Sequence, residues 1–198
     1  MSTAGAIAAY ALCTGTFALT ARCRARSAGD PLNFFPLLLF AVAAAGALSV
    51  HRAPLGLSAA VTLACVVVCA ATDISSGYVY DAVTYVSAAL ICADAAATGN
   101  LLPSIAGAGS VPTVAGGLHL VTSGRGFGLG DVKLLAVVGA GVAAAPALVV
   151  LGAAFVGSAA VLSVALLLRR VSSTDRIAFA PFVAAATVGI TLAQGVQS

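Results

Sequence analysis

The feature that most constrains this chain is a series of apolar runs, each about as long as a bilayer-spanning helix, which needs about 20 residues. Backbone polar groups in lipid must be hydrogen-bonded within the protein, so such runs predict helices. The runs lie at residues 4–21, 34–50, 55–72, 79–97, 103–121, 131–145, 147–168 and 177–195. We therefore expect an all-α fold, a polytopic integral membrane helical bundle of about eight transmembrane helices.

Composition excludes a soluble protein. Hydrophobic residues make up 61% of the 198 residues and charged residues 8%. No hydrophilic stretch is long enough for a separate domain, so we expect residues 1–198 to form a single membrane domain in contact with the lipid bilayer. The net charge of +3 comes mainly from arginines in predicted loops. This pattern indicates anchoring at a membrane face and not nucleic-acid binding.

The basic residues predict an orientation. No basic residue precedes the first apolar run, whereas Arg22, Arg24 and Arg26 follow it, which is the reverse of a secretory signal peptide. We expect a retained first helix with its N-terminus outside. With eight spans, every basic residue except Arg52 then falls on the cytoplasmic side, in agreement with the positive-inside rule.

The fifth run, 103–121, is the weakest because it contains Pro112 and several glycines. If this run did not span, the loop that carries Arg125 and Lys133 would move to the outer side and break the charge bias. The charge pattern therefore supports a fifth span.

No metal site or cofactor is expected from the chain. The five cysteines form no Cys-x-x-Cys pair, and Cys65 and Cys69 share one helix face without the further ligands that zinc requires. His51 and His119 lie far from them in sequence. Small apolar side chains in packed helices are the expected role of these cysteines.

Two acids stand at the ends of predicted helices. The chain has six aspartates and no glutamate, and an ionisable group near the bilayer is a candidate functional residue. Asp73 follows the third run and Asp131 opens the sixth, so the predicted topology brings both to the cytoplasmic face. Two nearby carboxyl groups share one proton, so one can activate water while the other protonates a carbonyl oxygen. Gly128 and Gly130 allow close backbone approach before Asp131.

Each of these residues also has a simpler interpretation. Asp131 could serve only as a helix N-cap, Asp73 as a solvated loop acid and Lys133 as a membrane anchor. Asp81 is another candidate cap, and Asp94 is a candidate snorkelling or pore-facing acid near the outer end of the fourth helix. The competing function is a small membrane transporter or ion-path protein that uses its intramembrane aspartates, and a third is an inactive scaffold of a secretion assembly.

The stretch Gly128–Ala136 closely resembles the Gly-x-Gly-Asp motif of type IV prepilin peptidases, a family of intramembrane aspartic proteases. Asp73, followed by Asp81 and Thr84, resembles the first catalytic aspartate of that family with its downstream partners. The later segment Ile177–Ala184 resembles the family's run before the last helix. The resemblance covers roughly residues 55–195, which we expect to form the catalytic core.

The resemblance implies an aspartic endopeptidase that cleaves the leader of pilin-like precursor proteins at the cytoplasmic face of the cell membrane. It implies that Asp73 and Asp131 are the catalytic pair, and that four further residues bind substrate or support the site: Gly128, Gly130, Lys133 and Asp81. The chain lacks the cytoplasmic Cys-x-x-Cys loop of the larger forms, so it resembles the short, peptidase-only form and methyl transfer is not expected.

The chain departs from the family pattern at two places. The segment Val79–Asp81 stands where the family often has Ile-Pro-Asn, and Ala178 and Ala180 replace a proline and a glycine of the later run. Neither departure removes one of the two expected catalytic aspartates.

Overall fold

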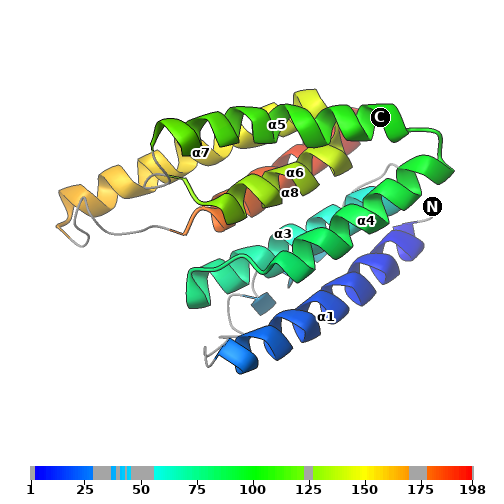
Figure 1. Cartoon of the computed structure of the whole chain (residues 1–198), viewed down its shortest axis with the longest axis horizontal. Helices are drawn as coiled ribbons and strands as arrows, with labels where there is room; N and C mark the ends of the chain where they lie inside the picture. The colour runs from blue at the N-terminus through cyan, green and yellow to red at the C-terminus, as the bar shows by residue number, and fades with distance from the viewer. Residues whose placement is uncertain are drawn as a thin grey trace.

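A computed structural model describes residues 3–28, 37–38, 41–42, 44–45, 56–122, 127–169 and 178–197. Its helices are α1 (Thr3–Ala28), α3 (Leu57–Ser76), α4 (Asp81–Ala97), α5 (Leu101–Val121), α6 (Leu129–Val142), α7 (Ala144–Leu167) and α8 (Ala180–Gln197). They lie side by side along the long axis of the molecule (Figure 1). No strand occurs among the described residues, which confirms the all-α fold.

Helix α3 lies at the centre of the bundle. It packs against α1, α4, α6 and α8, and its side chains from Ala60 to Thr72 are all buried. Such a helix is apolar all round because no face of it meets solvent or lipid. The position of α3 matters for function because its last turn carries Asp73.

The outer helices present large apolar side chains on the outside of the bundle. Examples are Leu102, Ile105 and Leu120 on α5 and Val149, Val156 and Leu167 on α7. Among the described residues, four helices are long and apolar enough to cross a membrane: α1, α3, α5 and α7. A lipid-facing surface explains these exposed apolar residues, since extended apolar surface is unfavourable in water.

The number of eight transmembrane helices is not confirmed. Seven helices have defined bounds in the described part of the chain, and α4, α6 and α8 are not among the four that meet the length and hydropathy expected of a span. Most of the second predicted run, 34–50, falls outside the described residues. Residues 37–38, 41–42 and 44–45 of that run are helical.

Helix α1 is longer than its apolar run predicts. It continues to Ala28 instead of ending near residue 21, so Arg22, Arg24 and Arg26 lie in its last turns and not in a loop. Arginine and alanine are both good helix formers, so the charges end the apolar run without ending the helix. Basic residues near a helix C-terminus are also favoured by the helix dipole.

The break between α6 and α7 falls at Ala143 and not at Pro146. Ala143 has φ 68°, a backbone conformation that non-glycine residues rarely adopt. Pro146 lies in the first turn of α7. Proline is tolerated there because the first backbone N–H groups of a helix have no partner within the helix.

The fifth predicted span forms one continuous helix, with Pro112 inside it. It crosses α6 closely at Gly107 and Gly139, where a Cβ atom on either glycine would overlap the carbonyl oxygen of the other. The hydroxyl of Ser104 donates to the carbonyl oxygen of Ala140 on α6 (2.9 Å). Small residues and interhelical hydrogen bonds of this kind are typical of helix pairs in membranes. The glycines that made this run look weak are therefore partly packing residues.

This crossing predicts a stability difference between two glycines of one helix. Replacing Gly107 with Ala should lower the unfolding temperature in detergent, because overpacking costs about 1–3 kcal/mol. Replacing Gly109 with Ala is the matched control, since a Cβ there meets nothing within 4 Å. That variant should be as stable as the parent or more so, because alanine favours helix over glycine by about 1 kcal/mol. Equal stability of the two variants would contradict the close crossing.

Candidate active site

One end of the bundle brings together four helix termini. The last turn of α3 lies beside the first turns of α4, α6 and α8, at the left-hand end in Figure 1. These termini come from distant parts of the sequence. Three of them carry the expected site residues Asp73, Asp81 and Asp131, and the fourth carries a backbone N–H that contacts Asp73.

Asp73 lies in the last turn of α3, which continues to Ser76 and not only to residue 72. Gly77 ends the helix in a left-handed conformation (φ 71°), and its N–H donates to the carbonyl oxygen of Asp73 (2.9 Å). The Asp73 side chain is half-buried and accepts a hydrogen bond from the backbone N–H of Ala180 at Oδ2 (3.0 Å). Asp73 is therefore a helix residue held by a second helix, and its interpretation as a solvated loop acid is wrong.

Ala180 is the first residue of α8, so the carboxylate of Asp73 sits at the positive end of that helix. The carbonyl oxygen of Phe179 accepts from the N–H groups of Phe182 and Val183 and thereby starts α8. Sequence reasoning placed this segment only by resemblance, and missed that its backbone holds Asp73. The signal that could have found it is Pro181, since proline close after the start of an apolar run indicates a helix N-terminus.

Asp131 is the third residue of α6, and Gly128 is the N-cap. The alternative interpretation of Asp131 as the N-cap of this helix is therefore wrong. Its carboxyl group instead accepts a hydrogen bond from the backbone N–H of Gly128, which is how an acidic residue three places into a helix supports the first turn. The absence of a side chain on Gly128 matters, because a Cβ there would lie 3.2 Å from Asp131 Oδ2.

The structure brings Asp73 and Asp131 together. The negative charge of Asp73 acts on the carboxyl group of Asp131, and both acids act on the buried thiol of Cys69, one helical turn before Asp73. Gly130 lets α6 approach the link between α3 and α4, since a Cβ on Gly130 would lie 3.1 Å from Cβ of Val79. Both carboxyl groups are half-buried, and they lie near enough for the charge of one to act on the other.

Three phenylalanines join the helix starts that hold the acids. The ring of Phe127, just before the start of α6, lies 5.1 Å from that of Phe179 and 5.7 Å from that of Phe155 on α7. His119 at the end of α5 donates from Nδ1 to the carbonyl oxygen of Phe127 (2.6 Å). The chain before α6 is thus held by aromatic packing and by one hydrogen bond, and sequence reasoning missed both.

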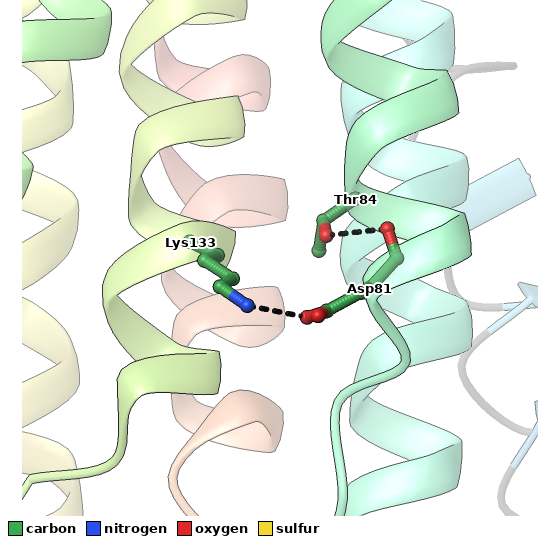
Figure 2. A network of polar contacts seen from close by, with 3 residues as sticks. All are labelled: Asp81, Thr84 and Lys133. Atoms are coloured by element: carbon green, nitrogen blue, oxygen red, sulfur yellow. Dashed lines mark hydrogen bonds and ion pairs between the residues drawn. The ribbon is translucent and has the colours of Figure 1, made fainter.

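Lys133 and Asp81 form an ion pair beside the acids (Figure 2). Lys133 Nζ lies 2.7 Å from Asp81 Oδ1, and 5.5 Å from the centre of the Tyr85 ring. Asp81 is the first residue of α4, with Tyr80 as the N-cap, and the Thr84 hydroxyl donates to the Asp81 carbonyl oxygen (3.0 Å). The structure therefore brings all the expected site residues to one end of the bundle.

Asp94 lies at the opposite end of α3. Its Oδ2 accepts hydrogen bonds from the backbone N–H of Ser58 (3.0 Å) and from the Ser58 hydroxyl (2.5 Å). Ser58 and Asp73 are about 22 Å apart along the helix at 1.5 Å per residue. Between them α3 is lined by buried and mostly apolar side chains. Asp94 therefore caps a helix, and the four aspartates in the described part of the chain do not form the series along the bundle that an ion path would use.

The described residues contain no group of three or more histidine, cysteine or acidic side chains that could hold a metal ion. His51, one of the two histidines, lies outside the described residues. The expectation of a reaction without metal or cofactor stays a prediction, with a test given below.

Comparison with known proteins identifies the family. The sequence model of the type IV leader peptidase family matches residues 60–168, which include both Asp73 and Asp131. Neither the curated proteins nor the solved structures that were searched gave a match. The matched residues run from α3 to the end of α7 and make up more than half of the chain, which confirms the family expected from the glycine-rich stretch. The chain belongs to the type IV leader peptidase family, and it is a helical membrane protein with the protease activity that this family implies.

Proposed function

We propose that this protein is an aspartic endopeptidase that cleaves the leader peptide of pilin-like precursor proteins, with Asp73 and Asp131 as its catalytic pair. The observation that carries the proposal is the meeting of these two carboxyl groups at one end of the bundle, 58 positions apart in the sequence. Family membership supplies the class of reaction, and the pair supplies the groups that can perform it.

In the proposed mechanism the two carboxyl groups hold one proton between them. The ionised group takes a proton from water, and the water oxygen attacks the carbonyl carbon of the scissile peptide bond. The protonated group donates to the carbonyl oxygen, and a proton then passes to the leaving amine as the C–N bond breaks. Two carboxyl groups and water are sufficient for every proton transfer in this sequence.

The N-termini of α6 and α8 fix the pair before substrate binds. Asp73 is held by the N–H of Ala180 and Asp131 by the N–H of Gly128, so neither side chain has to be ordered during the reaction. The site lies at the end of apolar helices. A leader joined to a membrane-embedded helix would present its cleavage site at this depth.

We propose that this end of the bundle faces the cytoplasm. Arg22, Arg24 and Arg26 in the last turns of α1, Lys133 near the start of α6 and Arg169 after α7 all lie there (Figure 1). Basic residues are enriched on the cytoplasmic side of membrane proteins. Other basic residues, among them Arg52 and Arg125, lie outside the described residues.

Cysteine labelling in intact cells tests this orientation with a matched pair of exposed positions. Tyr78→Cys lies at the active-site end and Asn100→Cys at the opposite end, in a background with the exposed Cys23 and Cys92 replaced by serine. A membrane-impermeant thiol reagent should label Asn100→Cys, and should label Tyr78→Cys only after the cells are opened. Labelling of Tyr78→Cys in intact cells would reverse the proposed orientation.

A cleavage assay with purified protein tests the proposed reaction. The protein should cut a pilin-like precursor in detergent or vesicles, and treatment with a strong chelator should leave the rate unchanged because no step uses a metal. The same precursor with a bulky residue in place of glycine before the scissile bond should be a poor substrate, because the proposed binding position beside Gly128 and Gly130 would accept only a small side chain. Loss of activity in chelator that is restored by added zinc would contradict the aspartic mechanism.

A further inference from the structure

We infer that the Lys133–Asp81 ion pair is a positioning device that holds Asp131 opposite Asp73, an inference that rests on the proposed function. The pair joins the first turns of α6 and α4 at the protein surface, where Lys133 is 35% exposed and Asp81 54% exposed. Among the described residues, the Asp73 carboxyl group is hydrogen-bonded to the start of α8 and not to Lys133 or Asp81. The role inferred here is to fix the rotation of α6 about its axis.

The spacing of Asp131 and Lys133 makes the two contacts interdependent. Each residue of an α-helix turns by about 100°, so side chains two positions apart point about 200° apart. Asp131 faces the acid at the end of α3, whereas Lys133 faces Asp81 and the Tyr85 ring on α4. A rotation of α6 that moves Asp131 away from Asp73 therefore also moves Lys133 away from Asp81.

Residues 128–130 at the start of α6 offer few side chains that could resist such a rotation, and packing of α6 against the core begins only at Val132. Gly128 and Gly130 have none, and Leu129 between them is 58% exposed. The contact of Gly130 with Val79 sets how closely α6 approaches the link between α3 and α4, but a glycine has no side chain to lock into its neighbour. A directional contact at Lys133 supplies the constraint that packing at residues 128–130 does not.

Lys133 has a second partner on α4 besides Asp81. The aromatic ring of Tyr85, one turn into α4, attracts the ammonium group of Lys133 from a second side. Asp81 is the first residue of α4, and the Thr84 hydroxyl donates to its backbone carbonyl oxygen (Figure 2). The link from Asp73 through Gly77 and Val79 to Asp81 is short, so α6 is fixed against the same segment that follows the other acid.

Four variants test the inference: Lys133→Met, Asp81→Asn, their combination, and Lys133→Arg. Each single loss should lower kcat for precursor cleavage by about two- to fivefold, the range expected for a partly exposed ion pair, with little change in KM. The double variant should be no worse than either single variant, since both act on one contact. Lys133→Arg should keep most of the rate because it preserves the pair. Arg169→Met, which removes the same charge at the end of α7, should not change kcat.

A distance measurement without substrate separates this inference from the proposed function. Spin labels at Tyr78→Cys and Leu129→Cys, both exposed in the parent, report the position of the α6 start against the α3–α4 link. The distance distribution from double electron–electron resonance should be narrow in the parent, broader in Lys133→Met and narrow again in Lys133→Arg.

An unchanged distribution in Lys133→Met, or a raised KM with unchanged kcat, would overturn the inference and assign Lys133 to substrate contact. Broadening without any fall in kcat would also overturn it, because α6 would then move without consequence for cleavage. If the parent protein cleaved no pilin-like precursor, the proposed function would fail while the spin-label result still reported on the ion pair.

Discussion

Replacing Asp73 or Asp131 with asparagine should reduce the rate of leader cleavage by about 10²–10⁴-fold, the contribution typical of general acid–base catalysis. Asparagine has nearly the shape of aspartate and can still accept the hydrogen bond from Ala180 or Gly128, but it cannot exchange a proton with water or substrate. The variants should therefore insert and fold like the parent. The measurement is kcat/KM for a pilin-like precursor, with protein amount and unfolding temperature determined in parallel.

Asp94→Asn is the matched control for these variants. It makes the same chemical change in α4, near the other end of the central helix α3, where Asp94 accepts hydrogen bonds from Ser58 and takes no part in the proposed reaction. This variant should lose some stability, because a helix cap contributes about 0.5–2 kcal/mol, and should keep its cleavage rate. Full cleavage by Asp73→Asn, or loss of cleavage by Asp94→Asn at parental stability, would refute the assignment of the pair.

Replacing Ala180 with proline should have the second largest effect, although Ala180 carries no reactive group. Proline has no N–H, so it removes the donor of the hydrogen bond that Asp73 accepts and puts a ring carbon in its place. The first position of a helix tolerates proline well, so α8 should still form. Loss of a hydrogen bond to a charged group costs about 1.5–3 kcal/mol, so we expect cleavage to fall by about 10- to 100-fold. The measurement is again kcat/KM, with circular dichroism as the check that α8 persists.

Ala178→Pro is the control for the proline substitution. Ala178 precedes α8, and its N–H is not the donor to Asp73. The family resemblance also has proline at this place. The control should cleave the precursor at nearly the parental rate. If Ala180→Pro cleaved equally well, the N–H of Ala180 would have no role in holding Asp73.

Apolar runs in the sequence predict most of the described helices because membrane helices must be apolar and long. Their ends are predicted less well, and the reasons are local. The charges of Arg22 and Arg24 end an apolar run but not a helix, and Pro146 is a helix breaker that stands in a first turn where it breaks nothing. The conformation of Ala143 that ends α6 has no signal in the residue type itself.

The acid pair could be predicted because helix ends alternate between the two membrane faces, so topology alone places Asp73 and Asp131 on one side. What holds the pair could not be predicted. The donors to Asp73 are the backbone N–H groups of Ala180, 107 positions away, and of Phe179 beside it, and the donor to Asp131 is the N–H of Gly128. Backbone groups are the same in every residue, so their partners depend on packing that a single sequence does not show.

The contacts of the supporting residues also depend on packing that the sequence does not show. Lys133 and Asp81 were candidates by resemblance, but their ion pair depends on how α6 lies against α4. Asp94 was a candidate pore-facing acid because its position in α4 is clear from the sequence, whereas its bond to Ser58 depends on the packing of α3 against α4. In each case the residue type indicates that the side chain makes a polar contact, and the packing of the helices determines which residue is its partner.

The most direct test of the central claim, that Asp73 and Asp131 act as one catalytic unit, is a double-mutant cycle on precursor cleavage. The rates of Asp73→Asn, Asp131→Asn and the combined variant are compared in one assay with the parent. If the two acids share a proton in one mechanism, removing the second after the first costs nothing further, and we predict that all three variants cleave at the same residual rate. A combined variant whose loss is the product of two separate losses would show that the acids act independently and would contradict the account.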